Sequence, residues 1–417
     1  MPPAADPAVE EPYRGGGPLA ASPTVPGGEA LVGIRRSSTF LPELESVRGI
    51  AVLLVFAFHA DVFIRFPFIE PKSTLATAFV RAGYTGVDLF FLLSAFLLSL
   101  PFFVEAAGGR RVVLRDYFVR RTLRILPLFY SAVLVATVLC ATELRDLAHG
   151  LPYLLFLNSF PNMTVPFDPY SGVWWSLATE VQFYLVLPLL LLFLRMRWGW
   201  LAGAAFIGAY ALAYIAMVRG SLRMWTIVGQ MAFINSVFGR GPLFLWGIFA
   251  AAVFQHAGGW LRERLAQRRW LRMGGADLLL LALILANAFF LRWLVSIGAV
   301  RQMSARDQAW HVVNGALWAA FLLLILLAPL RTKVLFSNRI LGWLGILSYS
   351  IYMIHMPFMQ RSLWGLRRAW PGHVDWGWTP LSFAVIVVLS AGCVALSAFT
   401  YRFIERPFLV RKARFDS

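Results

Sequence analysis

The stretch ESVRGIAVLLVFAFHAD, residues 45–61, decides the fold of this chain. It is mostly apolar and, at about 1.5 Å per residue, long enough as a helix to cross most of a hydrocarbon layer roughly 30 Å thick. We expect this helix to begin at the cytoplasmic surface with Ser46 as its N-cap. A plain anchor needs neither Arg48 nor His59. Eleven residues close to within about 20° of three full turns, so the two side chains share one face about 16 Å apart.

The composition extends this reading to the whole chain. Of 417 residues, 59% are hydrophobic and 14% are charged, which indicates a polytopic membrane protein. We predict an all-α bundle of ten transmembrane helices, because stretches long enough to span recur along the chain. They are residues 44–63, 84–106, 125–141, 174–194, 198–218, 237–254, 276–298, 310–330, 340–358 and 380–404.

Three regions follow from the same pattern. Residues 1–40 are rich in Pro, Gly and Ala and are predicted to be a disordered cytoplasmic tail. Residues 41–410 form the transmembrane domain, and residues 411–417 a short basic tail. The N-terminal region lacks the apolar core of a cleavable signal, so the first span is expected to direct insertion.

The net charge of +17 is explained by topology and requires no nucleic-acid partner. With the N-terminus in the cytoplasm, 24 of the 38 Lys and Arg residues lie on the inner side, counting Arg402 at the inner end of the last span. Another 12 lie on the outer side, counting Arg240 at the outer end of the sixth span, and Arg48 and Arg292 lie within spans. This bias predicts both termini inside and a location in the cell (cytoplasmic) membrane. The oligomeric state is left open.

Metal and disulfide chemistry are not indicated. The two cysteines, Cys140 and Cys393, lie in separate apolar spans, where a small buried hydrophobic role is expected. The sequence has no metal-ligand motif and no nucleotide-binding glycine loop, so we expect no bound cofactor.

Polar residues within the spans divide into two layers. The outer layer contains His59, Asp88, Glu180 and His355, which are counted to similar depths and are candidates for acid/base chemistry. Asp88 is expected to hold the His59 imidazole in one tautomer, unless it serves only as an acid at a helix N-terminus. Trp174 and Trp175, at the start of the fourth span, are expected at the membrane interface.

The inner layer is rich in arginine and is predicted to bind phosphate. Its members are Arg48, Arg120, Arg121, Arg124 and Arg402, with Glu405 beside the last of them. Simple explanations stay open, because inner arginines also orient membrane chains and interfacial charges form salt bridges. Gly49, beside Arg48, permits the close approach of a ligand or of another backbone.

These motifs together resemble the acyltransferase-3 family of integral membrane acyltransferases. The resemblance covers about residues 41–410 and rests on six motifs in family order. They are Arg-x10-His at 48 and 59, GVDLFFLLSAFL at 86, Arg-x-x-Arg at 121 and 124, WSLATEVQFYL at 175, LSYSIYMIH at 347 and YRFIERP at 401. Two positions depart from the family pattern. Ala95 replaces a usual glycine, which affects local helix packing, and Val181 leaves Glu180 as the sole acid there.

The resemblance implies transfer of a short acyl group, most simply acetyl, from cytoplasmic acyl-CoA to a hydroxyl of a carbohydrate or glycolipid. It implies that the arginine pair contacts the CoA phosphates and that His59 is essential, with Asp88 and Glu180 as further catalytic candidates. His355 and the inner-layer residues are candidates for substrate binding. His59 acts either as a general base, which we favour, or as a nucleophile that carries the acyl group.

The acceptor is expected to meet the spans and the outer loops. The longest and most aromatic of these loops is 142–173, with Tyr153, Phe156, Phe167 and Tyr170. No appended SGNH-type domain is expected after the last span. Two other classes of function remain as alternatives: a transporter of a glycan or acylated metabolite, and a silent binding partner. Paired halves with broken helices, typical of transporters, are not evident.

Overall fold

The computed structural model describes residues 41–65, 74–160, 163–219, 232–298, 308–371 and 379–412. Residues 42–417 form one compact unit. Within the described ranges, all regular secondary structure is helical. The predicted tail 1–40 and residues 413–417 of the predicted basic tail lie outside these ranges.

The ten predicted spans are confirmed: ten described segments are long and apolar enough to cross a membrane. Their helices are α2 (Pro42–Arg65), α4 (Gly86–Ala106), α5 (Leu114–Cys140), α7 (Trp175–Leu191), α8 (Gly199–Arg219), α10 (Gly241–Gln267), α11 (Ala276–Ser296), α12 (Trp310–Leu327), α13 (Arg339–Ala369) and α14 (Pro380–Thr400). Shorter helices include α3 (Leu75–Arg81), α6 (Leu151–Leu154) and α15 (Arg406–Lys412). The chain is a multi-pass membrane protein.

Two helix starts differ from the prediction. Helix α2 begins at Pro42, and Ser46 lies inside it with a buried hydroxyl that has no partner, so Ser46 is not the N-cap. Proline suits the first helical position because its missing N–H is not needed there. Helix α5 begins at Leu114, about three turns before the predicted start of the third span. The basic run from Arg115 to Arg124 is therefore helical and not a loop.

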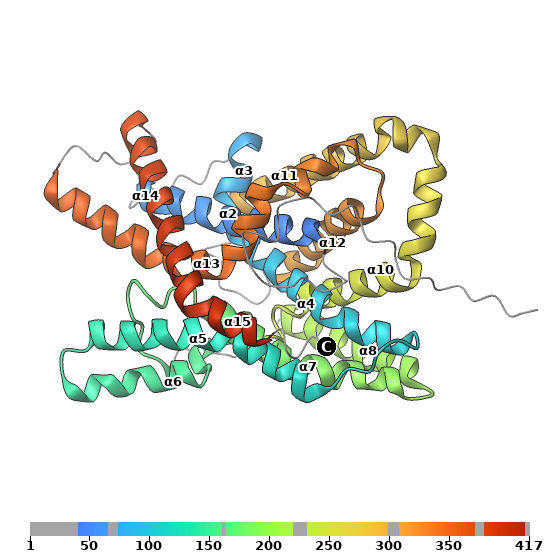
Figure 1. The fold of residues 1–417 in the computed structure, drawn as a ribbon, viewed down its shortest axis with the longest axis horizontal. Coiled ribbons are helices and arrows are strands. Elements are labelled where there is room, and N and C mark those ends of the chain that lie inside the picture. Colours follow the sequence, from blue (N-terminus) through green and yellow to red (C-terminus); the bar gives the residue numbers. More distant parts are fainter. Residues whose placement is uncertain are drawn as a thin grey trace, which may run out of the picture. The chain divides into compact units, whose positions relative to one another are not determined.

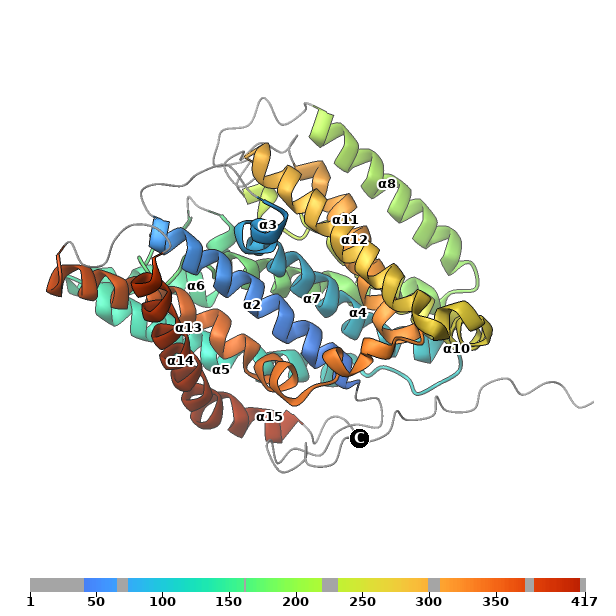
Figure 2. The same ribbon diagram turned by 90° about the horizontal axis from the view of Figure 1, so that it is seen from above.

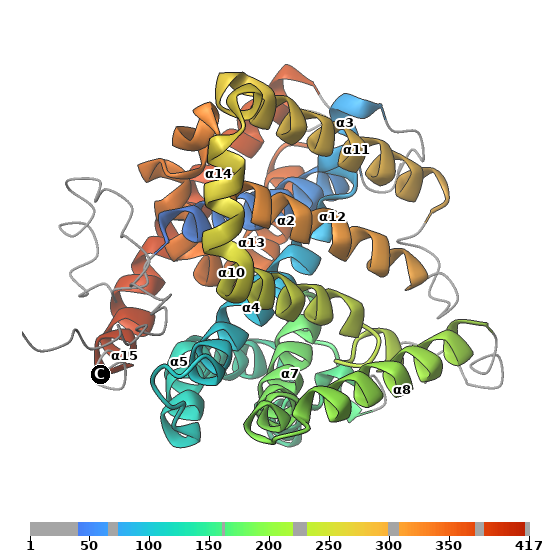
Figure 3. The ribbon, with the colours of Figure 1, turned by 90° about the vertical axis from the view of Figure 1, so that its right-hand side faces the viewer.

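Helices α2, α4, α10 and α13 form the centre of the bundle. Helix α2 packs on α13 and on α4, and α10 packs on α4 and α12. Figure 1 and Figure 2 show α2 between α13 and α4, with α8 at the edge of the bundle. In Figure 3, α10 runs beside α4 and continues toward α11. The first span thus lies at the centre of the protein and is not a peripheral anchor.

Small residues bring these helices into backbone contact. A Cβ atom on Gly49 would lie 2.4 Å from the Leu341 carbonyl oxygen, so another backbone, that of α13, approaches this glycine. Across the same contact, a Cβ on Gly345 would lie 1.9 Å from the Glu45 carbonyl oxygen. Ala95 packs similarly against α10, because a Cβ atom on Gly247 would lie 2.6 Å from the Cβ atom of Ala95. Lipid tails are as apolar as the side chains of a membrane helix, so the hydrophobic effect does not drive two such helices together. Close van der Waals packing of this kind stabilises the pair instead.

Replacing Gly345 with alanine is expected to destabilise the protein by about 1–3 kcal/mol, because the new methyl group overlaps backbone that has no rotamer to change. Gly342, one turn earlier on α13, is the matched control because a Cβ there meets nothing within 4 Å. Thermal unfolding in detergent checks this prediction. Equal melting temperatures for Gly345→Ala and Gly342→Ala would contradict it.

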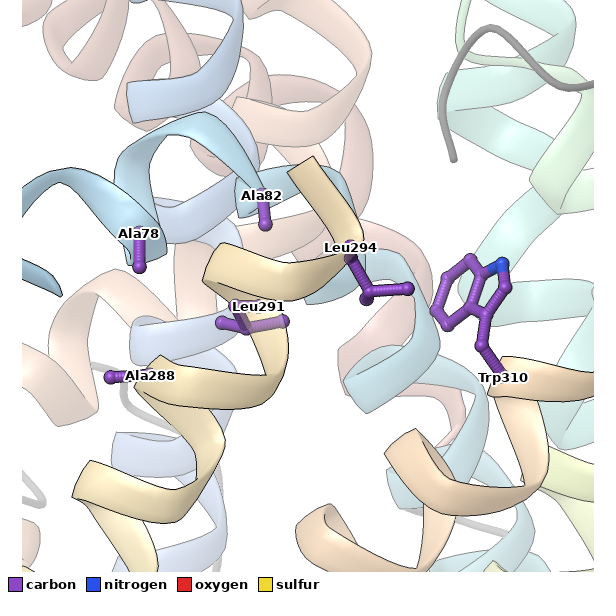
Figure 4. Packing of buried hydrophobic residues seen from close by; sticks show 6 residues of the cluster. All are labelled: Ala78, Ala82, Ala288, Leu291, Leu294 and Trp310. Carbon is purple, nitrogen blue, oxygen red and sulfur yellow. The ribbon is translucent and has the colours of Figure 1, made fainter. Parts of the chain in front are cut away.

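A small apolar cluster fixes the helices beside the site described below. Figure 4 shows Ala78 of α3 and Ala82, which directly follows α3, facing Leu291 and Leu294 of α11, with Trp310 at the start of α12. All five side chains are buried. The alanines allow the short helix α3 to lie close to α11, and the cluster holds the first turn of α12 in place.

Candidate active site

A narrow cavity of about 90 Å³ lies among the arginines of the predicted inner layer; we call it the arginine cavity. Helices α2, α4, α5, α7 and α13 supply its walls. Its polar lining comprises Arg48, Ser94, Arg121, Arg124, Ser176, Glu180, Tyr184, Ser348, Tyr349 and Tyr352. The structure therefore brings together three arginines from two helices, which the sequence grouped in one layer without showing that the helices are neighbours.

The arginine cavity carries more positive than negative groups. Three guanidinium groups face it, with Glu180 as the single carboxylate of its lining. Arg48 Nη1 lies 3.1 Å from Glu45 Oε1, and Arg124 stacks over the Tyr349 ring at 5.9 Å. Arg121 Nε is buried without a hydrogen-bond partner. A buried donor without a partner is costly, so this group is suited to an anionic ligand that would satisfy it.

Glu180 does not lie in the layer predicted for it. The prediction grouped it with His59, but it lines the arginine cavity and accepts a hydrogen bond from the Ser94 hydroxyl. Its depth was counted from Trp174 and Trp175, which were expected at the membrane interface. Trp174 is instead only 1% exposed, so it packs inside the bundle and does not mark the membrane interface.

A second cavity, of about 160 Å³, contains His59; we call it the histidine cavity. It is lined by Val55, Phe58, His59, Tyr84, Val87, Asp88, Gly172, Val173, Trp175, Arg240 and Tyr352. Val87 and Tyr352 also line the arginine cavity, so these two side chains separate one cavity from the other. The Tyr352 hydroxyl is held by Ser176 Oγ at 2.6 Å and by the Val173 carbonyl at 3.0 Å.

His59 and His355 form a directed pair. His355 Nδ1 lies 3.0 Å from the Ile351 carbonyl and 2.8 Å from that of Tyr352. Carbonyls only accept hydrogen bonds, so Nδ1 carries the proton in neutral His355 and Nε2 is an acceptor. That Nε2 lies 3.2 Å from His59 Nδ1, which also lies 2.9 Å from the Val55 carbonyl.

The same reasoning fixes the tautomer of His59. Both neighbours of its Nδ1 accept a hydrogen bond, so Nδ1 carries the proton in the neutral ring. Nε2 is then left with its lone pair, and it has no hydrogen-bond partner among the described residues. An imidazole held in this way presents a basic nitrogen of fixed identity.

The predicted contact between Asp88 and His59 is wrong. Asp88 lines the histidine cavity, but its carboxylate accepts a hydrogen bond from Asn314 Nδ2 at 2.7 Å and pairs with Arg240 Nη1 at 3.5 Å. His355 is the residue that contacts His59 Nδ1, and its predicted part in substrate binding stays a prediction. Counting residues along each span gives the depth of a side chain in the membrane but not its neighbours. Asp88 and His355 were counted to similar depths, so the sequence could not show which of them contacts His59.

Three further inner-layer residues do not meet the arginine cavity. Within the described part of the chain, its lining includes neither Arg120 nor Arg402, and the Arg402 side chain is exposed. Glu405 is buried and accepts a hydrogen bond from the Ser350 hydroxyl. It lies in the π-helical turn Tyr401–Glu405, which rotates neighbouring side chains onto different faces.

Sequence reasoning missed the polar group beside Asp88, namely Arg240, His311 and Asn314. The available signal was weak. Arg240 directly precedes an apolar helix on the side where arginine was predicted to be scarce, and His311 and Asn314 are one turn apart at the start of α12. Nothing in their local sequence indicates that they face α4.

The aromatic loop 142–173 is largely packed into the protein. Tyr153 is buried and stacks on Phe167 at a centroid distance of 5.0 Å, and Phe156 stacks on Phe129 at 4.8 Å. Tyr170 is half-buried and has Arg361 over its ring. Most of the predicted acceptor aromatics thus hold the loop in place.

Comparison with known proteins now adds to this geometry. The model of a family described as an acyltransferase domain matches residues 41–399, which is most of the chain. The chain belongs to the acyltransferase-3 family. No solved structure matches it. The family match includes every residue that lines the two cavities. Five of the six motifs that carry the resemblance lie within it, and the sixth, YRFIERP, begins at residue 401, just beyond its end.

Curated relatives of this acyltransferase-3 protein are distant. It is 22% identical over 91% of its length to the peptidoglycan O-acetyltransferase OatA of Listeria monocytogenes, of which 57% is covered. It is 20% identical over 88% of its length to a putative peptidoglycan O-acetyltransferase of Bacillus subtilis, of which 55% is covered. A nodulation protein of Rhizobium leguminosarum is 28% identical over 77% of this chain and 81% of its own length. The chain spans about half the length of the first two relatives.

Proposed function

We propose that this acyltransferase-3 protein transfers a short acyl group, acetyl in the simplest case, from acyl-CoA to a carbohydrate hydroxyl. One observation carries the proposal: a cavity lined by three arginines adjoins a cavity containing a base-ready histidine, and only Val87 and Tyr352 line both. The first suits a polyanionic donor and the second suits proton transfer. Two relatives, one named a peptidoglycan O-acetyltransferase and the other a putative one, support the reaction class.

The donor is assigned to the arginine cavity through its phosphates. Guanidinium groups bind phosphate oxygens in pairs, and Arg121 and Arg124 lie three residues apart on one face of α5. Arg48 adds a third positive group from α2. In acyl-CoA, an extended pantetheine arm joins the phosphates to the thioester. We propose that this arm runs along α2 and carries the thioester toward His59.

The chemistry is assigned to His59 as a general base. Its Nε2 accepts the proton of the acceptor hydroxyl while the hydroxyl oxygen attacks the thioester carbonyl carbon. The C–O bond forms, the carbonyl oxygen takes the electron pair, and collapse of this intermediate breaks the C–S bond. The departing CoA thiolate receives the proton from His59. His355 is a positioning residue in this scheme because it holds the imidazole through Nδ1.

The remaining candidates receive supporting roles. Glu180 limits the positive charge of the arginine cavity and is fixed by Ser94. Asp88 acts through Arg240. Arg120, Arg402 and Glu405 are assigned to the region where the donor enters, outside the cavity lining. We propose that this region faces the cytoplasm, with both termini inside and the protein in the cell membrane, since acyl-CoA is made in the cytoplasm.

A carbohydrate or glycolipid is proposed as the acceptor because the relatives that carry an acceptor in their name act on peptidoglycan. The histidine cavity borders the end of the aromatic loop through Gly172 and Val173, which gives the acceptor a route to His59. The alternative of a transporter gains no support from the family.

Purified full-length protein in detergent, given acetyl-CoA labelled in its acetyl group, tests the proposed function. Label is expected to appear in peptidoglycan fragments or other offered glycans, and the free thiol of CoA is expected to appear in equal amount. Release of thiol alone would show transfer to water. Absence of both label and thiol release, in protein that elutes as a single folded species, would overturn the proposal.

A further inference from the structure

Arg240 is a second charged group of the histidine cavity, and the reaction scheme above does not use it. It directly precedes α10, and its side chain is 12% exposed. It lines the same cavity as His59 and stacks over Trp175, with the guanidinium carbon 5.0 Å from the ring centroid. The cavity therefore combines a basic nitrogen with a fixed guanidinium group.

The guanidinium is held rigidly from one side. Its Nη1 pairs with Asp88 at 3.5 Å and donates to His311 Nε2. His311 Nδ1 lies 2.8 Å from the Gln308 carbonyl and so carries the proton, which makes Nε2 an acceptor. Asn314 holds the other oxygen of Asp88 at 2.7 Å. Asp88, His311 and Asn314 are all buried.

Part of the guanidinium remains unused. Its hydrogen bonds to described residues all come from Nη1, and Nε is buried without a partner. Nη2 therefore has no partner among the described residues, although Arg240 lines a cavity. A buried guanidinium with unpaired donors is costly unless a ligand or a transient charge pairs with them.

We propose that Arg240 is a catalytic residue that stabilises the negative oxygen of the tetrahedral intermediate, an inference that rests on the proposed function. When the hydroxyl oxygen attacks the thioester, the carbonyl electron pair moves onto oxygen, and Nη2 of Arg240 donates a hydrogen bond to it. Collapse returns that pair to the carbonyl and expels the CoA thiolate. Arg240 neither gains nor loses a proton in these steps.

Three features favour this role over that of a structural ion pair. The first is placement, because Arg240 and His59 line one cavity, where the base and the developing charge are both needed. The second is rigidity, because a guanidinium fixed by Asp88, His311 and Trp175 requires no reorganisation during the reaction. The third is the unused donors, since a purely structural arginine is expected to satisfy them within the protein.

Arg240→Gln is expected to lower kcat for acetyl transfer, or for acetyl-CoA hydrolysis, by about 100- to 1000-fold, the usual effect of removing an oxyanion donor. KM for acetyl-CoA is expected to stay unchanged, because the contact forms only in the transition state. Arg264→Gln is the matched control. Arg264 lies on α10, the helix that Arg240 precedes, is exposed and stacks over Trp260 at 5.6 Å, but lines neither cavity.

A donor analogue with a trifluoromethyl ketone in place of the thioester separates catalysis from structure, because its tetrahedral adduct carries the oxyanion. We expect Arg240→Gln to lose affinity for this analogue while keeping its affinity for CoA. Arg240→Lys retains the charge and the pairing with Asp88. If the glutamine variant does not fold, Arg240→Lys provides the same comparison of affinity for the analogue with affinity for CoA. Its affinity for the analogue is expected to lie between that of the wild type and that expected for Arg240→Gln.

The outcomes are distinguishable. Suppose that the wild-type protein is active and that a folded Arg240 variant has the same kcat and the same affinity for the analogue. This result would overturn the role of Arg240 and leave the proposed function standing. Parallel loss of affinity for CoA and for the analogue would also overturn it, because it would indicate a structural role. Wild-type protein that neither transfers acetyl nor hydrolyses acetyl-CoA would overturn the proposed function and this inference together.

Discussion

His59→Ala is expected to lower kcat for acetyl transfer by about 100- to 10,000-fold, because it removes the group that accepts the hydroxyl proton. Binding of CoA, measured by isothermal titration, is expected to stay close to that of the wild type, since His59 does not line the arginine cavity. The labelled-acetyl assay with purified protein measures the first quantity. A variant that transfers acetyl as fast as the wild type would rule out His59 as base.

His256→Ala is the matched control for this substitution. His256 lies on α10, is exposed and packs edge-on against Phe103 at 5.7 Å, and it lines neither cavity. The acetyl-transfer activity of His256→Ala is expected to equal that of the wild type. His355→Gln keeps an acceptor for His59 Nδ1, whereas His355→Leu does not, so the leucine variant is expected to lose more kcat than the glutamine variant.

The alternative role of His59 has its own signature. A nucleophilic histidine forms an acyl-imidazole and predicts ping-pong kinetics, with label held on the protein when the acceptor is absent. A general base predicts sequential kinetics with no labelled protein. Either role would use the lone pair that the Nδ1 contacts of His59 leave at Nε2, so the kinetics and the labelled protein decide between them.

The double variant Arg121→Gln/Arg124→Gln is expected to raise KM for acetyl-CoA by about 100-fold or more, since each charge-assisted hydrogen bond contributes about 1.5–3 kcal/mol. Both side chains line the arginine cavity, so their loss removes two of its three positive groups. The expected change in kcat is small, because phosphates are bound equally in the ground and transition states. Initial rates at varied donor concentration measure both parameters.

A truncated donor makes this experiment specific. Acetyl-pantetheine has no phosphates, so its KM is expected to be high in the wild type and unaffected by the two substitutions. Arg115→Gln is the control on the same helix, because Arg115 is exposed and does not line the arginine cavity. An equal rise in KM for both donors would show that the arginines maintain the structure and do not bind phosphate.

Much of the fold could be predicted from the sequence. All ten spans were located, because a helix that satisfies its own backbone hydrogen bonds is what a long apolar stretch can form in hydrocarbon. Helix boundaries were less certain: α5 continues for about three turns before its apolar part, since arginine is a good helix former. Apolar content alone does not reveal such an extension.

The sequence predicted many of the residues that line the candidate site, but it did not predict which of them contact one another. Arg48, Arg121 and Arg124 meet in one cavity, whereas the sequence placed them in one layer and could not show that α2 and α5 are neighbours. Glu180 and Asp88 were placed by counting depth along single helices, but Glu180 lines the arginine cavity and Asp88 pairs with Arg240. Depth also carries no information about which neighbour a side chain faces.

The sequence by itself determined the class of the protein, its spans, its family and the residue types available for chemistry, because these depend on local hydrophobicity and on motifs within single helices. Only the tertiary structure decided that His355 rather than Asp88 holds His59, and that Arg240 enters the same cavity. Glycine contacts such as Gly49 with Leu341 set how close and at what rotation α2 and α13 meet. A rotation of one helix changes every partner on its face and leaves its hydropathy unchanged.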